Sequence, residues 1–255
     1  MFLLNYNCKL IFLLESPYFF ISTKDEYKPK NGTFMIFFDK DCLLFLKELS
    51  QNNNREWFNK NKERYIKSVK EPFKIFIQHM IYKIQEDNPN LIVTPKEAIF
   101  RIYRDVRFSK DKSPYKTQLG AVIANGGRKS LNGTEVYIEI SPQYVRLYSG
   151  IYQLSKENLY NLRTYIAKNL TLFNKTLNDK KFKRTFKTIL GDRNKRLPKE
   201  FQSVFEKQPL IANKQFYFYK EEKAELLLSE KLTAILVKHY FTSKPMNTFL
   251  KEGIK

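Results

Sequence analysis

The residues best suited to chemistry lie in one short segment, IFRIYRDVRFSKDKSPY, between Ile99 and Tyr115. The segment holds three of the chain's eleven arginines within seven positions. A guanidinium is a planar fork of N–H donors that matches a carboxylate or a phosphate, whereas an ammonium is a point charge. We therefore interpret the segment as an anion site, for phosphate, a nucleotide or a nucleic-acid backbone. The candidate anion-binding residues are Arg101, Arg104, Arg107, Lys110, Lys112, Tyr115 and Arg128, with Asp105, Asp111 and Glu56 as supporting carboxylates.

Two other interpretations of the same residues stay open. In one, Asp105 and Asp111 neutralise the arginines in an internal ion-pair network that binds no ligand. In the other, the protein processes phosphoryl groups or nucleotides, and the arginines stabilise developing negative charge. The acid, base or nucleophile would then come from Asp105, Asp111, Lys112 and Tyr115. The sequence has no GxxxxGK[ST], GxGxxG, HExxH or GxSxG motif, so no catalytic residue is assigned.

The arginine segment is predicted to be a β-strand, in which alternate residues share a face. One face is apolar except for Arg104, and the other carries Arg101 and Arg107. Because unpaired burial of a charge costs several kcal/mol, we expect Arg104 to be largely buried and paired with a carboxylate, with Glu56 as the first choice. Arg101 and Arg107 would then form the ligand site. The apolar face would consist of Phe100, Ile102, Val106 and Phe108.

The surrounding elements predict an α+β fold with a mainly antiparallel sheet packed by helices, a long N-terminal helix and a helical C-terminal half. Helical periodicity indicates a short helix after Asp39 or Asp41 and a long one over 55–85, kinked or divided at Pro72. Connections too short for helical crossovers indicate antiparallel pairing of the strands. Ser155 is expected to cap a helix, and Pro245 to open the second of two helices in the tail. The expected strands are 119–124, 136–140, 144–148 and 215–219.

We expect residues 35–255 to form one α+β domain. Residues 1–34 are interpreted as an extension outside it, with Met35 as an alternative start of the functional chain. The apolar run 10–14 is too short to span a membrane, and no secretory signal is evident. Cysteines and histidines are isolated along the chain, so no zinc site or disulfide framework is implied. We expect no metal, no cofactor, no membrane contact and a cytoplasmic location, and the oligomeric state is not assigned.

The charge balance bears on the partner. With 46 Lys+Arg against 26 Asp+Glu, the formal net charge is +20, which favours nucleic acid or another polyanion. Abundant lysine, asparagine, isoleucine, phenylalanine and tyrosine are also typical of an A/T-rich genome, in which lysine is partly a codon-bias surface residue. The stretch 175–199, with ten Lys/Arg and two acidic residues, is either a solvated face or a groove for phosphates. A phosphate-containing ligand or nucleic acid is the expected partner.

The segment FRIYRDVRFSKDKSPYKT resembles the signature RxxRDxRFxx[DN]KxxY of a bacterial conserved-hypothetical family, a domain of unknown function. The stretches NNREWF, GGRK and GIY are also similar to members of that family. The resemblance covers residues 38–249 and excludes the first 34. Glu200 stands where family members usually have glycine, and residues 207–215 form a shortened stretch. The resemblance implies no activity. The signature positions are Arg101, Arg104, Asp105, Arg107, Phe108, Asp111, Lys112 and Tyr115.

Overall fold

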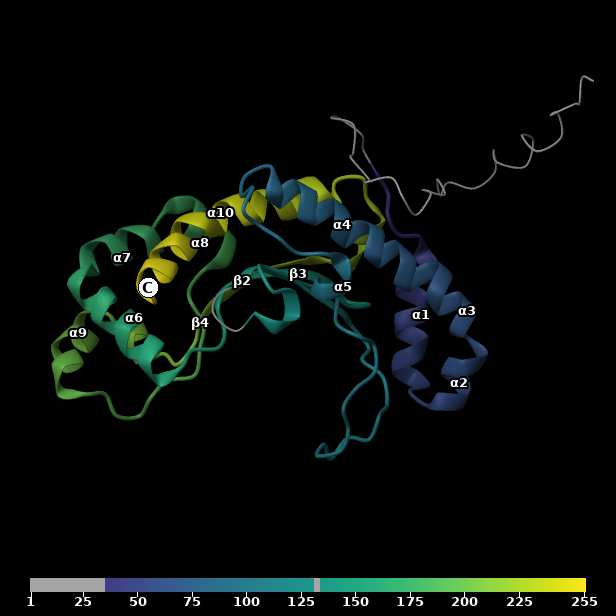
Figure 1. Cartoon of the computed structure of the whole chain (residues 1–255), viewed down its shortest axis with the longest axis horizontal. Coiled ribbons are helices and arrows are strands. Elements are labelled where there is room, and N and C mark those ends of the chain that lie inside the picture. The colour runs from purple at the N-terminus through teal and green to yellow at the C-terminus, as the bar shows by residue number, and fades with distance from the viewer. Residues whose placement is uncertain (1–34, 131–133) are drawn as a thin grey trace, which may run out of the picture. The chain divides into compact units, whose positions relative to one another are not determined.

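The computed structural model describes residues 35–130 and 134–255, and the expected extension, residues 1–34, lies outside the described residues. The chain within these ranges has the expected α+β fold, with a four-stranded antiparallel sheet in the order β1-β2-β3-β4. Helices α4 (Glu71–Gln85) and α10 (Leu232–Glu252) lie along the same face of this sheet (Figure 1). No helix among the described residues is both long and apolar enough to cross a membrane. The strands are β1 (Leu119–Ile123), β2 (Thr134–Ile140), β3 (Tyr144–Ile151) and β4 (Phe216–Lys223).

The sheet separates apolar from aromatic and charged side chains because successive residues of a strand point to opposite faces. Ile138 and Leu147 face the helices and are fully buried. On the other face Tyr137 pairs with Tyr148 across β2 and β3, and Tyr148 pairs with Tyr219 on β4. These tyrosines are only partly buried, so the second face is an open surface lined by aromatic rings.

The N-terminal helices follow the predicted periodicity, with a division near the predicted point. Asp39 caps α1 (Lys40–Gln51) by accepting a hydrogen bond from the Cys42 amide at 3.1 Å. The segment predicted as one long helix is interrupted by a π-helical turn, Ile66–Lys70, directly before Pro72. Pro72 sits in the first turn of the following helix, where its missing N–H leaves no intrahelical bond unmade. The resulting helices are α2 (Arg55–Lys60), α3 (Lys62–Tyr65) and α4 (Glu71–Gln85).

The C-terminal half packs a second hydrophobic core. Ser155 caps α6 through the Asn158 amide at 3.0 Å, as predicted. The prediction of two tail helices is wrong, because α10 runs unbroken through Pro245. Tyr240 before the proline belongs to the first core, and Met246 after it belongs to the second. Burial on both sides therefore keeps the helix continuous despite the lost hydrogen bond. The helices are α6 (Lys156–Lys168), α7 (Leu170–Leu177), α8 (Lys180–Phe186), α9 (Gln202–Lys207) and α10 (Leu232–Glu252).

The predicted arginine strand is also wrong. After α5 (Pro95–Ala98) the chain forms an irregular hairpin that projects away from the sheet (Figure 1). Its two arms are joined by an isolated bridge between Tyr103 and Tyr115, and by a 2.9 Å hydrogen bond from the Arg104 amide to the Pro114 carbonyl. Phe108, expected in the core, is 95% exposed. Beyond Tyr103 none of the described strands lies alongside to pair with, and the Asp, Ser and Pro residues there favour turns.

Candidate anion-binding site

In the distal part of the hairpin, residues 104–113, the arginines form ion pairs with aspartates of the same loop. The Arg107 guanidinium donates two hydrogen bonds to the Asp105 carboxylate, and the Nη2–Oδ2 distance is 2.7 Å. Arg104 donates to Asp111 Oδ2 and to the Ser113 carbonyl at 3.1 Å. Hydrogen bonds from Ser113 and then from Arg104 lower the pKa of Asp111 to about 2. In this loop the predicted arginines and aspartates therefore neutralise one another.

The other predicted loop residues also support the hairpin. Lys112 Nζ donates to the Val106 carbonyl at 3.0 Å. Tyr115 is buried, and its ring stacks on Phe58 with centroids 4.0 Å apart. Lys110 is exposed. None of these three lines the cavity at the base of the hairpin.

The predicted partnership between Arg104 and Glu56 is wrong. Glu56 lies in the first turn of α2 with 79% of its side chain exposed, and it pairs with Lys60 at 2.8 Å. Arg104 does have an acidic partner, Asp111. This residue lies seven positions further along the chain, and the hairpin turn brings it beside Arg104. Its side chain remains 26% exposed, so the pair is only partly buried.

The Arg128 side chain is held at the C-terminal end of α5 by the turn at Gly127 and by backbone carbonyls. Gly127 has φ +55°, and a Cβ there would lie 2.5 Å from the Glu97 carbonyl oxygen. The glycine thus lets the turn approach the α5 backbone closely. Arg128 Nη1 then donates to the carbonyls of Lys96 and Ile99, the latter at 2.8 Å. The guanidinium caps the carbonyl end of this short helix while lining the pocket beside it.

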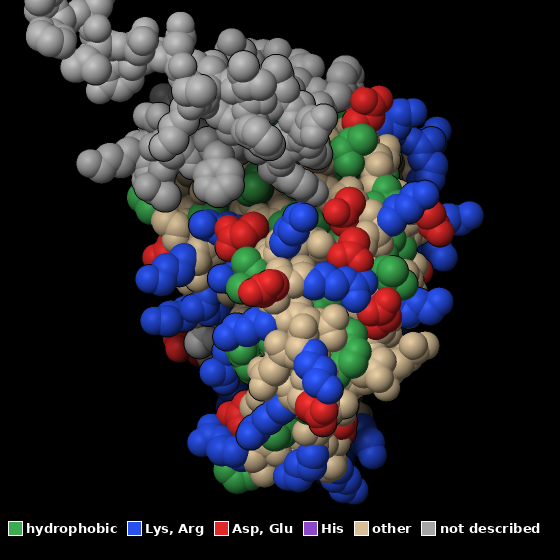
Figure 2. Space-filling model, turned by 90° about the vertical axis from the view of Figure 1, so that its right-hand side faces the viewer, with side chains coloured by type: hydrophobic (Ala, Val, Ile, Leu, Met, Phe, Trp, Pro, Cys, Tyr) green, Lys and Arg blue, Asp and Glu red, His purple; other side chains and the backbone are tan. Residues whose placement is uncertain are grey.

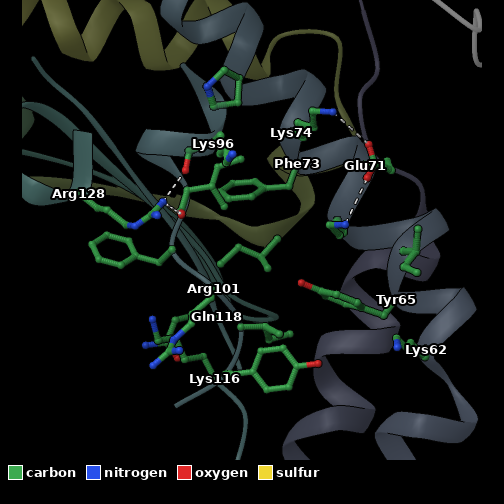
Figure 3. Close-up of a pocket in the computed structure, with 18 of the residues that line it drawn as sticks. Lys62, Tyr65, Glu71, Phe73, Lys74, Lys96, Arg101, Lys116, Gln118 and Arg128 are labelled. Atoms are coloured by element: carbon green, nitrogen blue, oxygen red, sulfur yellow. Dashed lines mark hydrogen bonds and ion pairs between the residues drawn. The ribbon is translucent and has the colours of Figure 1, made fainter. Parts of the chain in front are cut away.

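A basic pocket of about 840 Å³ lies between α3, the π-helical turn, the first turns of α4, α5 and the base of the hairpin (Figure 3). Its one lining carboxylate among the described residues, Glu71, is shared by Lys70 at 3.7 Å and Lys74 at 3.8 Å. We call this cavity the basic pocket. Its cations are Lys62, Lys70, Lys74, Lys96, Arg101, Lys116 and Arg128, and its rings include Phe58, Tyr65, Phe73, Phe100 and Tyr103.

Arg101 and Lys116 differ from Arg104, Arg107 and Lys112, whose side chains are held within the hairpin. Within the described residues neither side chain donates a hydrogen bond or forms an ion pair, and both line the basic pocket. Lys116 Nζ lies 4.9 Å from the centroid of the Phe100 ring, a favourable cation–π distance. Burial, and then the nearby charge of Arg101, lower the pKa of the Lys116 amine. The hairpin therefore brings Arg101 and Lys116 to one cavity without a carboxylate partner in the described residues.

Tyr65 adds a hydrogen-bond donor to the pocket, into which its hydroxyl points (Figure 3). Burial, followed by Tyr103 and Glu71, raises the pKa of Tyr65 to about 12. The hydroxyl therefore keeps its proton at neutral pH and can donate to an anion.

Sequence reasoning named Arg101 and Arg128 but missed the helical side of the pocket. Lys62, Ile66, Lys70 and Lys74 recur at four-residue steps, so they share one helix face. That repeat was the sequence signal that could have identified the helical side of the pocket.

The face over α1 to α3 shows the contrasting case, in which cations and carboxylates are interspersed (Figure 2). There Arg64 is held by Asp41 at 2.6 Å and by Glu48.

No group of three or more His, Cys, Asp or Glu residues in the described ranges is placed to hold a metal ion. The model of the family described as "Conserved hypothetical protein (DUF2461)" matches residues 41–249. No curated protein and no solved structure matches the chain.

Proposed function

We propose that this chain, which belongs to the DUF2461 family of conserved hypothetical proteins, binds a phosphate-bearing anion in the basic pocket. One observation carries the proposal: Arg101 and Lys116 face the same cavity with no ion-pair partner in the described chain. The folded chain keeps these like charges close together, and a bound anion would offset their repulsion. In this proposal the ligand binds at the base of the hairpin, and the distal loop has a supporting role.

Phosphate suits the donors better than a carboxylate does. An arginine fork, an ammonium and a phenol present N–H and O–H groups from several directions, and a phosphate offers three or more oxygens to receive them. Seven cations against one carboxylate also give the pocket a positive potential, which raises the local concentration of anions and their rate of entry. The aromatic rings offer an apolar surface on which an organic portion of the ligand can pack.

Catalysis is the less supported alternative. Asp105 and Asp111 are held by arginines, Lys112 by backbone carbonyls, and Tyr115 by a stacked ring. In the pocket itself the groups able to transfer a proton would be Lys116 and Tyr65. Binding is therefore the function that these contacts favour.

Nucleic acid is a second candidate, favoured by the stretch 175–199. All ten of its lysines and arginines are exposed in the structure, as a phosphate-contacting surface requires. Reversing the charge of Lys180, Lys181, Lys183 and Arg184 should weaken binding to a DNA duplex at low salt. Unchanged binding in that variant would leave the stretch as a solvated face.

Isothermal titration calorimetry with inorganic pyrophosphate tests the main proposal. The Lys116→Met variant should bind about 10- to 100-fold more weakly than the parent chain, the range expected for losing one charge-assisted hydrogen bond. The matched control is Lys110→Met, an exposed lysine of the same hairpin outside the pocket, which should bind like the parent. Absence of pyrophosphate binding by the parent chain at low salt would overturn the proposal.

A further inference from the structure

A second cavity, of about 630 Å³, lies on the open face of the sheet beside the basic pocket. Phe100, Lys116, Gln118 and Arg128 line both cavities and so form their common wall. The two cavities are therefore adjacent, with these four residues at their boundary. We call the second cavity the tyrosine pocket, after Tyr137, Tyr148, Tyr152 and Tyr217 in its lining.

The tyrosine rings form a surface rather than a closed core. Tyr137 and Tyr148, paired across β2 and β3, have ring centroids 5.5 Å apart. Tyr152 is 64% exposed and meets Tyr217 edge to face at 5.4 Å. Gly120 makes room for the first of them, since a Cβ there would lie 2.7 Å from the Tyr137 hydroxyl. Partly exposed rings of this kind stack well on flat aromatic groups.

The tyrosine pocket also contains a held carboxylate. Tyr137 donates to Glu139 at 3.3 Å and Tyr148 at 3.4 Å, while Arg146 lies 3.5 Å away. Only 12% of the Glu139 side chain is exposed. A carboxylate oxygen has two lone-pair sites, so Glu139 can still accept a hydrogen bond from a ligand. The preferred ligand group is an amine or ring N–H.

Phe100 connects the two chemistries. Its ring meets Tyr137 edge to face, with centroids 6.1 Å apart, while Lys116 Nζ lies over it. A phosphate at Lys116 and Arg101 would therefore stand next to the tyrosines. Lys116 and Arg128 disfavour a cationic occupant of the tyrosine pocket, and Glu139 disfavours a purely apolar one.

We propose that the tyrosine pocket binds a nucleobase, so that the ligand of the two cavities is a nucleotide with its phosphate in the basic pocket. The base stacks on the rings of Tyr148 and Tyr152, and its amino group donates to Glu139. This inference rests on the proposed function, because it presumes that the basic pocket holds the phosphate. A nucleotide can be free or part of a single strand, and both sources present the same base and phosphate.

Calorimetry with adenosine 5′-monophosphate and ribose 5-phosphate separates the two claims. The nucleotide should bind about 5- to 100-fold more tightly than the sugar phosphate, the range expected for stacking one base. Equal affinities would overturn the nucleobase inference and leave the phosphate proposal standing. Failure of both ligands and of pyrophosphate to bind would overturn the two together. An oligoadenylate titrated in parallel identifies the source: tighter binding than the mononucleotide means a single strand, and binding no tighter means a free nucleotide.

Matched variants locate the base. Tyr152→Leu should lose most of the preference for the nucleotide over ribose 5-phosphate while keeping its affinity for pyrophosphate. Tyr160→Leu is the control, because Tyr160 is likewise exposed, at 49%, and meets Phe201 edge to face at 5.5 Å far along the chain on α6. Glu139→Gln should narrow the preference for the adenine nucleotide over the uridine nucleotide, whose base lacks an exocyclic amine. An unaltered preference in Tyr152→Leu would overturn the assignment of the base to this pocket.

Discussion

The two ends of the arginine motif are alike in sequence and unlike in surroundings. At the loop end, Arg104 and Arg107 are paired with Asp111 and Asp105 of the same hairpin. At the pocket end, Arg101 lines a cavity and has no ion-pair partner in the described chain. A cluster of arginines therefore does not by itself indicate a binding site. Whether an arginine is available to a ligand depends on which carboxylates the backbone brings close to its guanidinium.

The two ends also differ in what their charges do for stability. Exposed ion pairs such as Arg107 with Asp105 contribute little, because water screens them and ordering two side chains has an entropic cost. At the pocket end, burial and the charge of Arg101 lower the pKa of Lys116, so keeping that amine charged opposes folding. An unfavourable arrangement of this kind is common where charges serve binding.

The largest expected effect is on the free energy of unfolding, when Gly127 beside the pocket end is replaced. Gly127→Ala should destabilise the fold by about 2–4 kcal/mol, because the new Cβ meets the α5 backbone and the residue has a positive φ. Gly126→Ala is the control: its φ is +83° but its nearest neighbouring atom lies 3.8 Å away, so only about 1–2 kcal/mol is expected. Urea unfolding measures both. Equal losses would mean that the close approach to α5 has no energetic weight.

The next effect sharpens the comparison directly by removing one arginine from each end. Arg101→Met should weaken pyrophosphate binding about tenfold or more, the loss expected for a charge-assisted contact. Arg107→Met should change the affinity less than about twofold, since its charge is already offset by Asp105 and is screened by solvent. Titration calorimetry at matched ionic strength gives both values. Equal weakening would show that the loop end belongs to the site.

The fold was predictable wherever local signals and tertiary packing agree. The Asp39 and Ser155 caps, the antiparallel sheet and the break before Pro72 follow from capping, short connections and missing donors. Both failures arise because tertiary packing overrode the local pattern. Residues 100–108 alternate like a strand, but a strand also needs a neighbouring strand to pair with. Pro245 predicts a break between two helices, but burial on both sides of the proline keeps them in one helix.

The site was predictable only in part. Arg101 and Arg128 could be named from the sequence, whereas Lys62, Lys70 and Lys74 required knowing which helix face meets the hairpin. Partners across the chain were harder still, and local pairing with Asp111 prevailed over the proposed Glu56 because a short turn returns it at little entropic cost. The domain boundary at residue 35 stays a prediction, tested by whether a chain starting at Met35 folds with an unchanged midpoint.

A smaller effect tests the loop end on stability. Arg104→Lys should cost about 1 kcal/mol, because an ammonium cannot keep the guanidinium's hydrogen bonds to both Ser113 and Ser109. A fully buried pair would lose several times more, and this pair is partly exposed. Arg107→Lys, at a more exposed pair, should leave the thermal midpoint unchanged. A loss at Arg104 as large as that at Gly127 would make the loop part of the structural core.

The smallest effect concerns the titration of Lys116. Burial and then Arg101 lower the pKa of its amine in the folded chain, while the unfolded chain has an ordinary lysine. Between the lowered and the ordinary pKa the unfolded state binds more protons, so stability relative to Lys116→Met should rise with pH across that window. The contribution is fully present above the ordinary lysine pKa and is lost as pH falls through the lowered one. Below the lowered pKa the difference should be flat.

Arg101→Met removes the second of these causes, so it should raise the Lys116 pKa towards the ordinary value and narrow the window. A bound anion stabilises the ammonium and acts in the same direction, so affinity for pyrophosphate should fall as pH rises through the lowered pKa. NMR titration of the Lys116 Nζ signal measures the shift, with the same amine in the unfolded chain as the reference. If the Lys116 amine titrates alike in the folded and the unfolded chain, with and without Arg101, the pocket end does not hold its charges in an unfavourable arrangement. The two ends then differ only in accessibility.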